Sequence, residues 1–197
     1  MTLKWAFQHN IMLLARWIPG LEMAADEWSR AKALEDRGDW CIRQEAFEWV
    51  CKTLNVRPEM DLFASRLNNK CDRYYSFRRD PRAMDFDALS ADKNWAQVAE
   101  VCYAAPPEHL VGKVLGKITR DKALVLLVCP LWEGAYWWTT LEQMTVRKTL
   151  LPMNLDTVLV GHGQDPTKAW KPPIAVAALV TAPAAAQMLR DQHCRAS

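Results

Sequence analysis

The uninterrupted apolar run A-L-V-L-L-V-C over residues 123–129 constrains the fold of this chain more than any other feature. A run of Leu and Val without polar alternation is typical of a strand that is buried on both faces. Pro130 ends the run, because proline has no N–H to donate to a sheet. A strand buried on both faces needs helices on each side of its sheet, which is the layering of α/β proteins.

Further candidate strands and helices alternate along the chain. The sequence predicts strands over 60–64, 98–105, 146–151, 157–160 and 174–181, and helices over 40–54, 108–119 and 137–144. The helix over 40–54 would carry Ile42, Ala46, Trp49, Val50 and Thr53 on one face. Strand–helix alternation with short connectors predicts a mostly parallel, doubly wound, Rossmann-like sheet.

Composition bounds the class of protein. The chain has 197 residues, enough for one sizeable core, and a formal net charge of +2. Such a small charge does not mark the whole chain as a nucleic-acid binder, so any basic footprint must be local. No stretch is apolar over the roughly 18 residues that a membrane span requires, so we expect no membrane partner.

The cysteines favour a reducing compartment. They stand at positions 41, 51, 71, 102, 129 and 194, without a C-x-x-C pair. Cys102 and Cys129 lie in apolar runs and are expected to be small buried hydrophobes. We expect an intracellular protein of the nucleus or cytoplasm. The mitochondrion is an alternative, because the first 21 residues lack acids and carry Lys4 and Arg16.

A local basic and aromatic cluster follows the strand expected at 60–64. Its basic members are Arg66, Lys70, Arg73, Arg78, Arg79 and Arg82, and Tyr74, Tyr75 and Phe77 stand between them. Arginines neutralise phosphates while rings stack on bases, which predicts a site for single-stranded nucleic acid. The alternative is a solvated loop whose rings enter the core and whose arginines pair with Asp72, Asp80, Asp85 and Asp87.

Two strand ends carry residues that suit a ligand crevice, since open α/β sheets bind ligands beyond the carboxyl ends of their strands. One end is Asp61 followed by Phe63 and Ala64, and the other is Y-A-A-P-P over 103–107. A Pro-Pro pair directly after a strand makes a stiff loop, because neither proline has an N–H.

These pieces resemble a known family. The motifs are M-D-L-F-A-S-R-L-N-N-K at 60–70, R-Y-Y-S at 73–76, R-D-P-R-A-M-D-F-D-A-L-S at 79–90, C-Y-A-A-P-P at 102–107, L-V-G-K-V-L-G-K-I at 110–118 and V-C-P-L-W-E-G-A-Y-W-W at 128–138. They are similar to the phage-type DNA N6-adenine methyltransferase-like domain of DIRS-type, tyrosine-recombinase retrotransposon polyproteins. Upstream, A-R-W-I-P-G-L-E-M-A-A-D-E-W-S-R at 15–30 resembles the end of the ribonuclease H domain that precedes it there.

The resemblance implies a ribonuclease H remnant over 1–38, a methyltransferase-type α/β domain over 39–189 and a tail over 190–197. Asp26 would be a vestigial ribonuclease H carboxylate, and no metal is expected because the other carboxylates of a two-metal site are absent from the sequence. The resemblance also assigns Asp61, Phe63 and Ala64 to a vestigial S-adenosylmethionine pocket.

The Pro-Pro loop departs from the family pattern. Amino-methyltransferases place Asp or Asn before Pro-Pro to accept a hydrogen bond from the target amine, and an aromatic after it to stack on the flipped base. Here Ala105 precedes Pro106 and Pro107, and Glu108 follows them. We therefore expect a degenerate loop, no methyl transfer and no cofactor, unless the pocket for S-adenosylmethionine survives.

The expected function is that of a retroelement-derived pseudoenzyme. It would bind RNA or DNA, or serve as a structural component of a ribonucleoprotein assembly with protein subunits. One alternative is an active S-adenosylmethionine-dependent DNA adenine methyltransferase. Another is a protein–protein assembly module without nucleic-acid contact, in which Trp132 and Trp138 form the interface.

Overall fold

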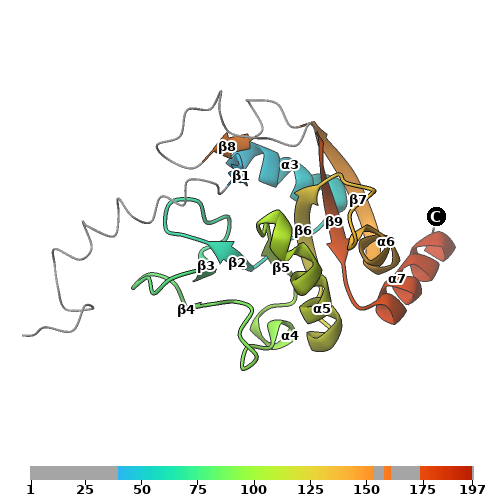
Figure 1. Ribbon diagram of the computed structural model, residues 1–197. Helices are drawn as coiled ribbons and strands as arrows, with labels where there is room; N and C mark the ends of the chain where they lie inside the picture. The colour runs from blue at the N-terminus through green and yellow to red at the C-terminus, as the bar shows by residue number, and fades with distance from the viewer. Residues whose placement is uncertain (1–39, 153–157, 161–173, 197) are drawn as a thin grey trace, which may run out of the picture. The chain divides into compact units, whose positions relative to one another are not determined.

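The computed structural model describes residues 40–152, 158–160 and 174–196 (Figure 1). The chain divides into two compact units, Met1–Asp36 and Arg37–Ser197, and every described residue belongs to the second. The expected ribonuclease H remnant with Asp26 therefore lies outside the described residues.

The second unit alternates strands with helices. Its elements are β1 (Trp40–Ile42), α3 (Gln44–Leu54), β2 (Met60–Ala64), β3 (Arg73–Ser76), β4 (Asp85–Phe86), α4 (Trp95–Val98), β5 (Cys102–Ala104), the 3-10 turn Glu108–Leu110, α5 (Val111–Asp121), β6 (Val125–Pro130), α6 (Trp138–Met144), β7 (Thr145–Pro152), β8 (Val158–Val160), β9 (Ile174–Val180) and α7 (Pro183–Ala196). This order confirms an α/β protein.

Seven of these strands form one mixed, mostly parallel sheet. The strand order is β4-β3-β2-β5-β6-β9-β7. The five strands from β4 to β6 are parallel, whereas β9 runs antiparallel to both of its neighbours, β6 and β7. The strands β1 and β8 form a separate antiparallel pair. The sheet is compatible with the Rossmann-like architecture that the sequence predicts.

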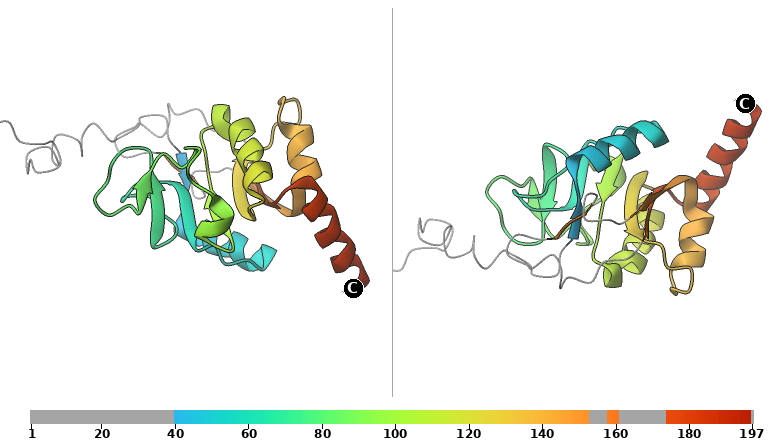
Figure 2. Two further views of the ribbon diagram at one scale, coloured as in Figure 1. Left: turned by 90° about the horizontal axis from the view of Figure 1, so that it is seen from below. Right: turned by 90° about the horizontal axis from the view of Figure 1, so that it is seen from above.

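Alternate side chains of the central strands pack into two hydrophobic cores, one on each face of the sheet. On β6, Val125, Leu127 and Cys129 join the core that contains α5 and α6. Leu126 and Val128 join the opposite core, which contains α3. Successive side chains of a strand point to opposite faces of the sheet, and both faces of β6 are buried. For this reason its sequence does not alternate between apolar and polar residues. The helices α3 and α5 lie on opposite sides of the sheet in Figure 2.

Several expected boundaries were wrong. The helix expected over 40–54 is β1 followed by α3, and its buried residues are Phe47, Val50 and Leu54, while Trp49 is 48% exposed. The strand expected over 98–105 begins only at Cys102, because Val98 ends α4, whose first turn is capped by the Asn94 side chain.

The segment of the basic and aromatic cluster, where the sequence predicts no strand, contains the short strand β3, and the short strand β4 follows it. At the other end of the unit, α7 continues beyond Leu189 to Ala196, where the sequence suggested a tail. Among the described residues, no helix is both long and apolar enough to cross a membrane. The described cysteines are free thiols, and Cys102 and Cys129 are fully buried, as expected.

Candidate functional site

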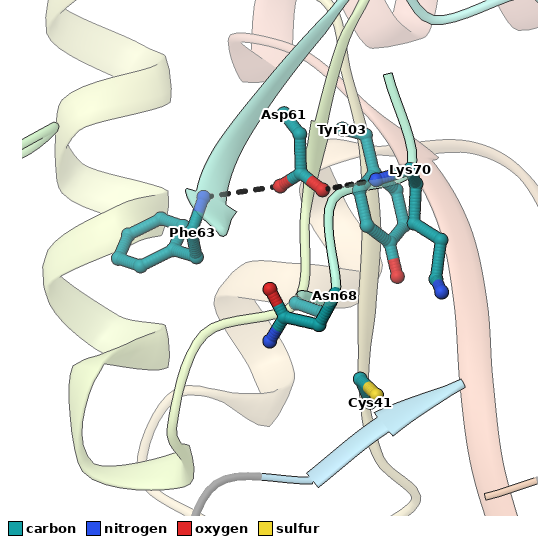
Figure 3. A pocket seen from close by; sticks show the side chains of 7 residues that line it. Cys41, Asp61, Phe63, Asn68, Lys70 and Tyr103 are labelled. Carbon is teal, nitrogen blue, oxygen red and sulfur yellow. Dashed lines mark hydrogen bonds between the residues drawn. The ribbon is translucent and has the colours of Figure 1, made fainter. Parts of the chain in front are cut away.

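A small pocket lies at the carboxyl ends of β2 and β5, where an open α/β sheet binds its ligands. It is lined by Cys41, Asp61, Phe63, Asn68, Lys70, Tyr103 and Ala105 (Figure 3). The fold thus brings together residues from both strand ends that the sequence singled out. Ala64, the third residue of the expected cofactor site, is buried next to them at the end of β2.

The carboxylate of Asp61 holds the loop that follows β2. Asp61 is 2% exposed, and its Oδ1 accepts a hydrogen bond from the backbone N–H of Phe63 at 3.1 Å. Its Oδ2 accepts from the backbone N–H of Lys70 at 2.9 Å. Asn68 folds the same loop, because its Oδ1 accepts from the N–H of Ser65 at 2.6 Å. The two bonds of this carboxylate to backbone N–H groups close the loop onto the end of β2.

Tyr103 lines the pocket next to the Asp61 carboxylate. It is the register partner of Asp61 across the β2–β5 pairing and is 2% exposed. Burial first, and then the charge of Asp61, raise the pKa of the Tyr103 phenol well above its ordinary value. Its ring meets the ring of Phe47 edge to face, with 4.9 Å between the centroids. Tyr103 is thus a neutral core residue that sequence reasoning placed only as part of a strand end.

The pocket is narrow. Its cavity of about 10 Å³ has room for about one water molecule. Sites for cofactor-sized ligands measure roughly 300–1,000 Å³. The loop from Ser65 to Lys70, closed onto Asp61, occupies the space beyond the strand end, so a cofactor would need this loop to move outward.

The Pro-Pro loop follows β5 at the same edge of the sheet. Ala105 is half-buried and Pro106 is buried, whereas Glu108 and His109 are exposed in the short 3-10 turn that leads into α5. An aromatic ring does approach this region, although from another element. Tyr136, in the loop after β6, lies against Gly112 in the first turn of α5 and is 79% exposed.

The two tyrosines of the basic cluster are core residues. Tyr74 and Tyr75 are 4% and 7% exposed. The Tyr74 hydroxyl donates to Asp80 Oδ2 at 3.0 Å, and burial together with this bond raises its pKa to about 12. These rings offer no free face for stacking, which corrects the sequence expectation for them. Phe77, the next aromatic along the chain, is 77% exposed.

The basic residues of the cluster fall into three groups. Arg73 is held by the protein itself, since its guanidinium donates to the Val98 carbonyl at 3.0 Å and to the Met84 sulfur at 3.1 Å. Arg66 and Lys70 are half-buried in the loop after β2. Arg78, Arg79 and Arg82 are exposed beyond the end of β3.

The neighbouring carboxylates form no ion pairs with the three exposed arginines beyond β3. None of Arg78, Arg79 and Arg82 forms an ion pair with a carboxylate of the described residues. Asp80 accepts from Tyr74 and from the Arg82 backbone N–H. Asp85 pairs with Lys93 at 2.9 Å, and Asp87 accepts from the Leu89 backbone N–H. The structure therefore does not show the alternative, in which these acids pair with Arg78, Arg79 and Arg82.

The tryptophans of the β6–α6 segment are mostly packed inside. Trp137 is 3% exposed, and Trp132 and Trp138 are half-buried against the core. Lys148 covers the Trp138 ring at 5.9 Å. The described residues of this segment thus offer less ring surface to a protein partner than the sequence suggested.

Comparison with known proteins adds no assignment. No protein-family model matches the chain, and no curated protein matches it either. Among the described residues, no group of three or more His, Cys, Asp and Glu side chains is placed to hold a metal ion. Two candidate binding sites follow from this geometry: the narrow pocket at Asp61 and the exposed arginines beyond β3.

Proposed function

We propose that this chain is a retroelement-derived, methyltransferase-type domain that does not transfer methyl groups and that binds nucleic acid through the exposed arginines beyond β3. The observation that carries the proposal is the state of Arg78, Arg79 and Arg82. They are exposed, and the acids next to them in sequence are bonded elsewhere. A group of exposed arginines that forms no ion pair with a described carboxylate has the charge that binds a phosphate backbone.

The sheet is compatible with the methyltransferase-type assignment. Five parallel strands, β4 to β6, are followed by β9, which lies antiparallel between β6 and β7. An ordinary dinucleotide-binding sheet has the parallel order 3-2-1-4-5-6 without this insertion.

Two features support the loss of catalysis. Ala105 has no polar atom in its side chain, so it cannot accept a hydrogen bond from an adenine amine at the position before Pro106 and Pro107. At the other strand end, the Asp61 carboxylate is bonded to two backbone N–H groups of its own loop. The loop after β5 therefore lacks the side-chain acceptor that the chemistry requires, and the Asp61 carboxylate is buried and bonded within its own loop.

The test is a binding titration of a labelled oligonucleotide at 50 and at 200 mM KCl, with fluorescence anisotropy as the readout. The proposal predicts binding that weakens by about tenfold or more over this range, because several phosphate contacts release counterions. A dissociation constant that does not change with salt, or no binding at 50 mM KCl, contradicts nucleic-acid binding through arginines.

A calorimetric titration with S-adenosylmethionine separates the proposal from the alternative of an active enzyme. The proposal predicts no heat of binding at millimolar ligand. Micromolar binding would instead favour the active adenine methyltransferase, and methylation of DNA and RNA would then be measured directly.

A further inference from the structure

We infer that the ligand of this surface is single-stranded nucleic acid, whose bases stack on Phe77 and on the guanidinium of Arg79. This inference rests on the proposed function and names its substrate class. The shared chemistry is that of an unpaired base with a phosphate on each side, which both RNA and DNA supply.

Phe77 is a ring held outside the core on a fixed backbone. The three residues before it, Tyr74 to Ser76, are buried in β3. The Ser76 hydroxyl donates to the backbone carbonyl of Arg78, which fastens the turn on both sides of Phe77. The turn therefore positions a ring that is 77% exposed, directly before two arginines.

The guanidinium of Arg79 is the second platform, and Phe86 supports it. Its Cζ lies over the Phe86 ring, 5.1 Å from the ring centroid. Lys93 approaches the same Phe86 ring at 5.8 Å and is itself fixed by its 2.9 Å ion pair with Asp85. A planar guanidinium supported on one side can stack on a base with the other side.

These platforms discriminate between single and double strands. In a duplex the faces of the bases are already stacked on one another, so an exposed ring such as Phe77 finds no free face. Unpaired bases present both faces, and stacking on an aromatic side chain contributes about 1–3 kcal/mol per base. Arg78 and Arg82 remain free of described carboxylate partners and suit the phosphates on either side.

The experiment compares four probes of one sequence: single-stranded RNA, single-stranded DNA and the two corresponding duplexes. We expect both single strands to bind more tightly than their duplexes. We also expect Phe77→Ala to weaken single-strand binding roughly thirtyfold, which corresponds to the middle of the range for one stacked base. Phe77→Trp should bind like the wild type, and duplex binding should be unaffected by either change.

Tyr136→Ala is the matched control, because Tyr136 is an equally exposed ring on a different loop. We expect this variant to bind as the wild type does. The inference is overturned if duplexes bind as tightly as single strands, or if Phe77→Ala has no larger effect than Tyr136→Ala. In both of those cases salt-dependent binding would persist and the proposed function would stand. Absence of binding to all four probes would remove both.

Discussion

Asp61 and Lys70 are joined through a hydrogen bond of 2.9 Å from the Lys70 backbone N–H to the carboxylate, across nine residues of chain. The other carboxylate oxygen accepts from the Phe63 N–H. Asp61 stands at a position where this type of fold binds ligands, but here its carboxylate has a structural role. It closes the loop after β2 over the end of the strand.

Changing Asp61 should therefore affect stability. We expect Asp61→Ala to lower the free energy of unfolding by about 1–3 kcal/mol, because two partly buried N–H groups lose their acceptor. The measurement is urea unfolding at pH 7. Asp72→Ala, at an exposed acid of the same loop, is the control and should change stability by about 0.5 kcal/mol or less. Equal values for the two variants would contradict the loop-closing role of Asp61.

A buried ion pair on α5 provides a second prediction. Lys117 Nζ lies 3.0 Å from Asp121 Oδ2, and both side chains are 4% exposed. Asp121 also accepts from the backbone N–H of Trp95 at 3.1 Å, so the pair anchors α4 to α5. We expect Lys117→Met to cost about 1–3 kcal/mol, because the buried Asp121 carboxylate loses one of its two cationic partners and keeps the other, Arg120 Nε, at 3.0 Å.

The double variant Lys117→Met/Asp121→Asn should be more stable than Lys117→Met alone. The asparagine carries no charge, and its carbonyl can still accept from Trp95. Thermal or urea unfolding of the wild type, both single variants and the double variant completes the cycle. Simple additivity of the two single effects would show that the charges are not coupled.

Much of this fold could be predicted from the sequence. The strand β6 has no polar residue because the fold buries both of its faces, and this alone implies helices on each side. Strand β2 and helix α6 carry equally clear patterns. The short strands β3 and β4 could not be found, because R-Y-Y-S and D-F gain their strand character from pairing with neighbours distant in sequence.

The site was harder to predict than the fold. The sequence brings Arg78 and Asp80 within two residues, yet Asp80 is bonded to the hydroxyl of Tyr74. Likewise, the i,i+4 spacing of Lys117 and Asp121 is visible in the sequence, but their burial is not. Exposed fractions and partners depend on packing between elements, which local pattern does not encode.

Buried thiols should make the protein sensitive to alkali. Burial raises the pKa of Cys102 and of Cys129 from 9.0 to about 12. In the unfolded chain these thiols ionise near pH 9, so above that pH the unfolded state binds fewer protons than the folded state. The stabilisation is complete below pH 9 and is lost as the pH rises toward 12, by up to about 1.4 kcal/mol per pH unit and per thiol.

The corresponding measurement is urea unfolding of the wild type and of Cys102→Ala/Cys129→Ala between pH 8 and pH 10.5. The double variant should be less stable at pH 8, but its stability should fall less steeply with pH. Parallel curves for the two proteins would contradict the assignment. Burial is the main cause that raises the pKa of the Cys71 thiol to about 12. Cys71 therefore accounts for part of the pH dependence of stability that remains in the double variant.

The end of α5 carries a strained residue. Lys122 is the C-cap of this helix and has φ of 54°, a left-handed conformation that disfavours residues with a side chain. We expect Lys122→Gly to raise the free energy of unfolding by about 0.5–1 kcal/mol. Lys122→Ala, which removes the charge and keeps the strain, is the control and should not stabilise the protein. A gain in both variants would point to charge instead of conformation.

The most direct test of nucleic-acid binding is the salt dependence of a variant that lacks two arginines. Arg78→Gln/Arg82→Gln is compared with Lys52→Gln/Arg57→Gln, which removes two exposed charges from α3 and from the segment before β2. We predict that the first variant binds a single-stranded oligonucleotide more weakly. The slope of its log binding constant against log salt should be shallower by about 1.4, whereas the control keeps the wild-type slope. Equal slopes in both variants would contradict binding through the arginines beyond β3.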